Sequence, residues 1–74
     1  MTTSARQTLL VAAETGEPVS LFGASGRLVS WGCVDHLDVP GGWVRLRRGS
    51  RVWTIALVTV REAELGAAPA VRAV

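Results

Sequence analysis

The stretch Arg27-Leu-Val-Ser-Trp-Gly-Cys-Val-Asp-His-Leu-Asp38 decides the fold that we expect of this chain. It is rich in valine, leucine and tryptophan and contains no proline, which favours an extended strand. Its 12 residues are roughly twice the usual strand length, and a strand that long in a small protein usually has to bend. Gly32 lies near its middle, where a glycine marks a bulge, a corner or a close approach of two backbones. We therefore expect one bent strand that belongs to both halves of a small barrel.

The residues before this stretch predict a helix and a short strand. Ser4 and Gln7 match the capping-box pattern, and the helical spacing that follows predicts a helix from about Ala5 to Glu14. Gly16 is its expected stop, and an irregular N-terminal arm is the alternative. The alternating segment Val19–Phe22 then predicts a strand that ends at a glycine-rich turn.

After the long strand, turn residues divide the chain into three more strands. The expected turns are Asp38–Gly42 and Arg48–Ser50, and the expected strands are Trp43–Arg47, Arg51–Ala56 and about Leu57–Glu62. This order predicts a mainly β domain over residues 1–65, a short N-terminal helix followed by a five-stranded bent SH3-like barrel. Residues 66–74 are predicted to be a flexible tail. An OB-like barrel is the weaker alternative, because the turn before Arg51 leaves no room for a helix between the third and fourth strands.

The composition indicates that the domain needs further support. A chain of 74 residues buries only about 60% of its unfolded surface and usually depends on a disulfide, a metal or a partner subunit. Cys33 is the only cysteine and His36 the only histidine, so neither an internal disulfide nor a metal cluster is expected. Because 49% of the residues are hydrophobic and the mean hydropathy is +0.32, we expect part of the surface to face another subunit.

The arginines indicate an anionic partner by their position more than by their number. The formal net charge is only +2, but all eight basic residues are arginines, whose planar fork binds phosphate and stacks on rings. Four of them fall within seven positions, and tryptophans lie on either side. We expect an aromatic and basic face built from Trp43, Arg45, Arg47, Arg51 and Trp53. The alternative is that the tryptophans are core or interface anchors and that the arginines belong to an interface.

The sequence does not predict an enzyme or a cofactor. Asp35 and His36 are neighbours, so in a strand they point to opposite faces and would not form a catalytic dyad. Cys33 is expected to be a small buried hydrophobe. No secretory signal and no membrane-spanning run is visible, so we expect a cytoplasmic protein in a reducing compartment.

Two segments resemble the motifs of the Sm-like family, and of bacterial Hfq in particular. The segments Val19–Phe22, Gly26 and Gly32–Asp38 resemble the first Sm motif, an apolar strand, a turn glycine and then Gly-x-apolar-x-x-aromatic-Asp. The segment Val52–Val60 resembles the second motif, in which an aromatic residue is followed by Lys-His-Ala-Ile-Ser-Thr-Val. The resemblance covers about residues 19–60, and the preceding helix also fits. It implies an Sm-type barrel.

The resemblance further implies a homo-oligomeric ring, a hexamer, that binds single-stranded RNA. It places His36 near the loop where ring proteins contact RNA. Thr54 and Ile55 stand where Hfq carries the Lys-His pair that lines its uridine pocket, so that chemistry does not carry over. Two other functions stay open: an oligomeric adaptor barrel that binds protein partners, and a ring that holds a small nucleotide between subunits.

Overall fold

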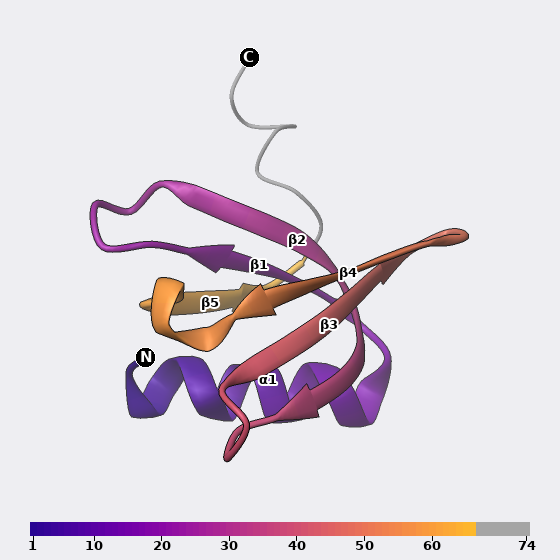
Figure 1. The fold of residues 1–74 in the computed structure, drawn as a ribbon, viewed down its shortest axis with the longest axis horizontal. Coiled ribbons are helices and arrows are strands. Elements are labelled where there is room, and N and C mark those ends of the chain that lie inside the picture. The colour runs from indigo at the N-terminus through magenta and orange to yellow at the C-terminus, as the bar shows by residue number, and fades with distance from the viewer. Residues whose placement is uncertain (67–74) are drawn as a thin grey trace.

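The computed structural model describes residues 1–66 and contains one helix followed by five antiparallel strands (Figure 1). In chain order the elements are α1 (Thr3–Thr15), β1 (Pro18–Phe22), β2 (Leu28–Asp38), β3 (Trp43–Arg48), β4 (Arg51–Ala56), the 3₁₀ helix η1 (Leu57–Thr59) and β5 (Glu62–Leu65). The strands form one bent sheet in the order β4-β3-β2-β1-β5. The predicted class, mainly β with an N-terminal helix and five strands, is confirmed. Within residues 1–66 no strand pairing joins β4 to β5, so the barrel is not closed.

The helix begins two residues earlier than the sequence pattern predicted. Thr2 is the N-cap, and its hydroxyl accepts the backbone N–H of Ala5 at 3.0 Å. The same hydroxyl donates to the Glu62 carboxylate of β5 at 2.7 Å, which ties the start of α1 to the sheet. That long-range contact explains why Thr2, rather than Ser4, is the cap. The predicted stop is confirmed, because Gly16 adopts a left-handed conformation (φ +78°) and its N–H closes the last turn on Ala12.

Strand β2 is shared between the two halves of the sheet, as its length predicted. Its first half, up to Cys33, pairs with β1, and its second half, from Cys33 onward, pairs with β3. The pairing register is interrupted at Val29 and again at Asp35, so the irregular positions lie on either side of Gly32. Gly32 itself is buried where two strands approach closely, since a Cβ there would lie 3.1 Å from the carbonyl oxygen of Arg47.

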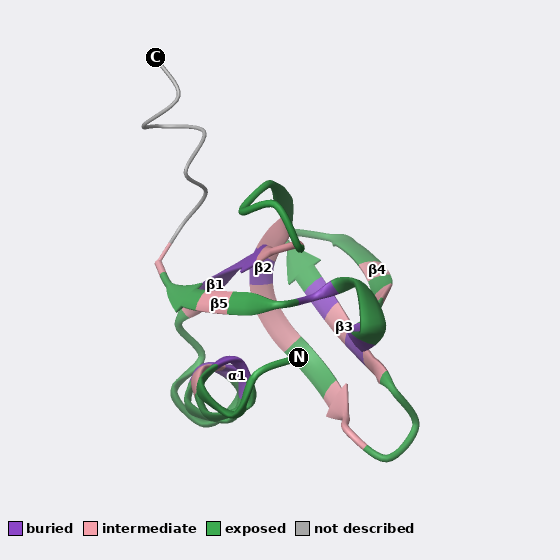
Figure 2. Cartoon of the chain, turned by 90° about the vertical axis from the view of Figure 1, so that its left-hand side faces the viewer, coloured by how far each residue is buried: buried purple, intermediate pink, exposed green. Residues whose placement is uncertain are grey.

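The core lies between α1 and the concave side of the sheet. Figure 2 shows buried positions on α1, β1 and β3. The side chains of this cluster are Leu9, Ala12, Val19, Leu21, Val44, Leu46, Leu57 and Val60. Since β3 contributes Val44 and Leu46 to it, the intervening residues of β3 point away from the core.

The prediction of a last strand over Leu57–Glu62 is wrong. A 3₁₀ turn follows β4 directly, and β5 begins only at Glu62. Leu57 and Val60 are both buried while Val58 is 89% exposed, which is the spacing of a tight helical turn rather than of a strand. The expected tail at residues 67–74 lies outside the described residues. Gly66, which was assigned to it, is hydrogen-bonded to Pro18 at the start of β1.

Candidate nucleic-acid interface

Three of the predicted site residues share one face of β3. Trp43, Arg45 and Arg47 alternate with the buried Val44 and Leu46, as the sequence predicted. We call their side of strands β2, β3 and β4 the outer face. The register places His36 directly opposite Arg45 in β2, and Thr54 opposite Arg45 in β4. Four of the six predicted residues, His36 included, are therefore together on the outer face.

One end of the outer face, where β3 begins and β4 ends, carries an open cavity beside Trp43, which we call the Trp43 hollow. The rings of His36 and Trp43 lie 5.3 Å apart at a tilt of 33°. The Arg45 guanidinium lies 5.4 Å from the centre of the Trp43 ring, within cation–π range. A cavity of about 370 Å³ adjoins them and is lined by Gly42, Trp43, Arg45, Thr54 and Ala56. A half-buried indole beside an arginine and an open cavity is suited to stacking a planar base next to a phosphate.

The turn between β2 and β3 holds Trp43 in place. Asp38 accepts the backbone N–H of Gly41 through its carboxylate and that of Gly42 through its carbonyl, both at 2.9 Å. Gly42 has φ +81°, and its carbonyl accepts the N–H of Leu57 at 2.8 Å. A Cβ at Gly41 would meet the Asp38 carboxylate and would lie 3.0 Å from Trp43 Nε1, so any other residue would displace one of these side chains. The sequence marked this segment as a turn but did not indicate that it contacts Trp43.

Asp35 partly neutralises the outer face. It is the extra residue of the bulge in β2, and its carboxylate lies 3.8 Å from Arg45 and 3.6 Å from Arg47. The three side chains are 35–52% exposed, so water screens these ion pairs and each contributes at most about 1 kcal/mol. Such a carboxylate keeps the two guanidinium groups close together, and a phosphate group can displace it from them. The sequence did not predict the contact of Asp35 with the two arginines. Regular alternation places Asp35 and His36 on opposite faces, whereas the bulge brings both to the outer face.

Arg51 and Trp53 do not belong to the outer face. The pairing of β3 with β4 sets Trp53 opposite the buried Leu46 and Arg51 opposite Arg48. Trp53 Nε1 donates to the Ser30 hydroxyl of β2 at 2.9 Å. The expectation of a single face for all five aromatic and basic residues is therefore wrong, and Trp53 packs against the core as the alternative predicted.

Trp53 belongs to a second cluster, which the sequence did not predict. The guanidinium of Arg48 lies 4.5 Å from the centre of the Trp31 ring and 4.9 Å from that of Trp53. These residues come from β2, β3 and β4, and the Trp53–Ser30 hydrogen bond joins β4 to a strand that is not its neighbour in the sheet. The cluster therefore helps to hold the bent sheet in shape.

We expect Trp53→Phe to lower the free energy of unfolding by about 1–2 kcal/mol, because the Ser30 hydroxyl loses its donor and the smaller phenyl ring packs less well against the core than the indole. Urea unfolding followed by circular dichroism measures this loss. Ser30→Ala should cost a similar amount, and the double variant should cost less than the sum of both. Strictly additive losses would show that this hydrogen bond does not stabilise the fold.

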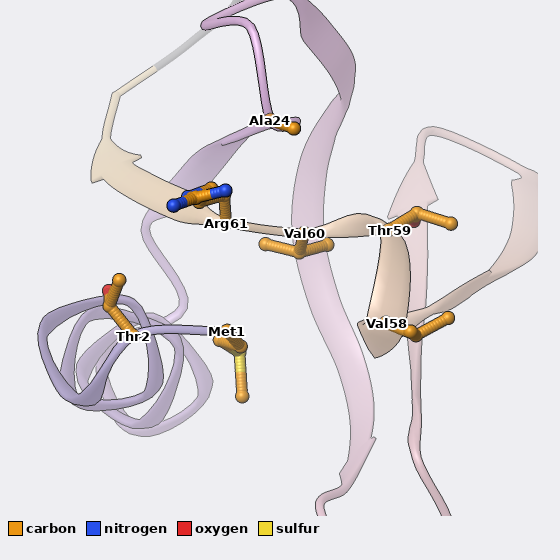
Figure 3. A pocket seen from close by; sticks show the side chains of 7 residues that line it. All are labelled: Met1, Thr2, Ala24, Val58, Thr59, Val60 and Arg61. Carbon is orange, nitrogen blue, oxygen red and sulfur yellow. The ribbon is translucent and has the colours of Figure 1, made fainter.

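A second cavity, of about 420 Å³, lies apart from the predicted residues. Figure 3 shows it between the start of the chain, the turn at Ala24 and the segment Val58–Arg61. Its lining mixes apolar side chains with two threonines, and Arg61 is the charged side chain. Within residues 1–66 no group of three histidine, cysteine or acidic side chains is arranged to hold a metal ion. In the same part of the chain no helix is long and apolar enough to cross a membrane.

Comparisons with protein-family models, with curated proteins and with solved structures gave no match. The likeness to Sm-like proteins therefore depends on the motifs of this sequence and on its order of one helix and five strands.

Proposed function

We propose that this chain is a non-enzymatic, Sm-like protein that assembles into a ring and binds single-stranded RNA on its outer face. The observation that carries the proposal is the Trp43 hollow, where the indole of Trp43 and the guanidinium of Arg45 line an open cavity and the His36 ring lies beside the indole. Stacking of a base on an aromatic ring is worth about 1–3 kcal/mol and needs no particular base. Arg45 and Arg47 supply the phosphate contacts.

The two free edges of the sheet support assembly. Strands β4 and β5 stand at the ends of the strand order, so each has one edge without a partner within residues 1–66. Each of these two edge strands carries an exposed apolar side chain. Val52 on β4 is 50% exposed, and Leu65 on β5 is 44% exposed. Pairing of β4 in one copy with β5 in the next satisfies both edges, and a head-to-tail contact of this kind forms a ring when the rotation between copies closes. Six copies is the number that the family resemblance implies.

Native mass spectrometry and RNA binding test the proposal together. We expect an oligomer with the mass of six chains of 7.8 kDa, and binding of a fluorescent single-stranded RNA that weakens steeply between about 50 and about 200 mM salt, because phosphate contacts release counterions. A monomer at micromolar concentration that unfolds cooperatively would contradict the ring. Parent protein that retains no RNA at low salt would contradict RNA binding.

An adaptor that binds protein partners is the second candidate, and the exposed apolar residues favour it. Val52 lies on the outer face opposite Arg47, and Val58 on η1 is 89% exposed. Association through such side chains is nearly indifferent to salt, whereas RNA binding is not. The salt titration therefore separates the two functions. Competition by a mononucleotide, but not by RNA, would instead favour the small-nucleotide function.

Replacing Asp35 by asparagine should strengthen RNA binding about two- to fivefold, because the carboxylate no longer competes with phosphate for Arg45 and Arg47. Fluorescence anisotropy with labelled RNA measures the change. Glu14→Gln removes the same charge from α1 and is the matched control. Weaker binding by the Asp35 variant would show that the carboxylate orients the two arginines instead.

A further inference from the structure

The tip of the β3–β4 hairpin sets two arginines directly against each other. Arg48 and Arg51 are paired in the register, and only Gly49 and Ser50 lie between them, with Gly49 at φ +60°. Directly opposed residues of antiparallel strands share a face, with Cβ atoms about 5 Å apart. Like charges in this position destabilise a hairpin. Arg48 and Arg51 therefore repel each other, to an extent that water limits because both are exposed.

No carboxylate compensates this pair in the described part of the chain. The two ion pairs among residues 1–66 involve Arg45 and Arg47, which share Asp35. Neither Arg48 nor Arg51 lies within 4.0 Å of an acidic oxygen there. The hairpin tip thus carries two uncompensated charges, whereas the outer face carries two arginines that already have an acidic neighbour.

Arg48 is also held in a fixed orientation. Its guanidinium lies within cation–π range of two rings, at 4.5 Å from the centre of the Trp31 ring and 4.9 Å from that of Trp53. Its stem passes over Gly32, where a Cβ would lie 3.5 Å from Arg48 Cγ. An arginine whose orientation is already fixed loses less entropy when it binds a planar array of oxygens.

We infer that Arg48 and Arg51 form a second anion site, which takes phosphate groups, on the opposite side of the β3–β4 hairpin from the Trp43 hollow. Arg48, held beside two indole rings, supplies a planar fork, Arg51 supplies a second charge across the strand pair, and a bound phosphate offsets their repulsion. The phosphate belongs either to an RNA backbone or to a free polyphosphate. The site does not depend on the proposed function, because it shares neither residues nor a face with the Trp43 hollow.

Thermal unfolding with sodium tripolyphosphate tests this site. At about ten times the dissociation constant, the melting temperature of the parent should rise by about 5 °C or more above that in sodium chloride of equal ionic strength. Arg51→Thr should lose most of this rise. In the absence of phosphate and at low salt, the same variant should melt above the parent, because the repulsion is gone. Arg48→Lys keeps the charge but not the fork, and should lose part of the rise.

Arg27→Thr is the matched control, because it removes an exposed arginine outside the hairpin; it should keep the full rise. A short single-stranded RNA replaces tripolyphosphate in a second series. If only RNA raises the melting temperature, the site binds the phosphates of an RNA backbone. If RNA and tripolyphosphate both raise it, the site accepts any phosphate chain. Equal protection of parent and Arg51→Thr by both ligands, or protection of neither protein, overturns the site. A variant that loses oligomer mass overturns it too, since Arg51 would then contact a neighbouring copy. Failure of RNA binding at the Trp43 hollow leaves the tripolyphosphate result unchanged.

Discussion

Gly32→Val should yield no soluble, folded protein. A Cβ at this position would lie 3.1 Å from the carbonyl oxygen of Arg47 and 3.4 Å from the Cβ of Leu46, both in the neighbouring strand β3. Neither atom belongs to the flexible end of a side chain, so β2 and β3 would have to separate where their pairing begins. Overpacking usually costs about 1–3 kcal/mol and more when backbone must move. A chain of 74 residues has only about 4–11 kcal/mol of stability to lose.

Expression level, size-exclusion chromatography and circular dichroism measure the outcome. Ala56→Val is the control, because it introduces the same side chain at an exposed strand position; it should fold like the parent. Gly32→Ala should give an intermediate loss. If Gly32→Val folds and melts within a degree or two of the parent, the close approach of β2 and β3 does not require glycine.

Most of the fold was predictable because local patterns and tertiary contacts agree. Alternation identified β3, the length of β2 indicated a shared strand, and Gly16 marked the end of α1. The end of the sheet was not predictable in this way. The run Ile55–Val58 is apolar at every position, and such a run is compatible with a strand covered on both sides or with a tight turn. Only the buried spacing of Leu57 and Val60 decides between them.

The candidate site was predictable within a strand but not across a turn. Alternation within β3 places Trp43, Arg45 and Arg47 on one face, and this does not depend on how the neighbouring strands pair with β3. Which face of β4 joins them depends on the length of the turn, because a shift of one residue moves every side chain to the other face. A turn over Arg48–Ser50 would have paired Arg47 with Arg51. The actual turn has two residues, so Arg51 pairs with Arg48 and leaves the outer face.

The bulge at Asp35 has a similar effect on β2. An extra residue cannot be located from alternation alone, yet it decides that His36 and the Asp35 carboxylate both reach the outer face. The electrostatics of the site therefore depend on an irregularity of the strand.

Replacing Arg45 and Arg47 together by alanine should weaken binding to single-stranded RNA at least tenfold, which corresponds to about 1.4 kcal/mol. Both guanidinium groups lie on the outer face beside the Trp43 hollow, and each is about half exposed and able to reach a phosphate. A single contact of this kind is weak in water, but a ring repeats it in every subunit and the losses multiply through avidity. The variant also leaves Asp35 without a cation, so its carboxylate repels the RNA backbone.

Anisotropy titrations over a range of salt concentrations measure both the affinity and its salt dependence. The slope of affinity against salt should become shallower, since fewer counterions are released, while native mass spectrometry should show an unchanged oligomer. Arg6→Ala with Arg27→Ala removes the same charge from α1 and from the turn before β2, and is the matched control. Equal losses in both double variants would show that net charge, and not the outer face, governs RNA binding. Loss of the oligomer only in the Arg45 and Arg47 variant would show that these arginines join subunits. Neither residue would then be free to contact a phosphate, and the proposed RNA contact would be wrong.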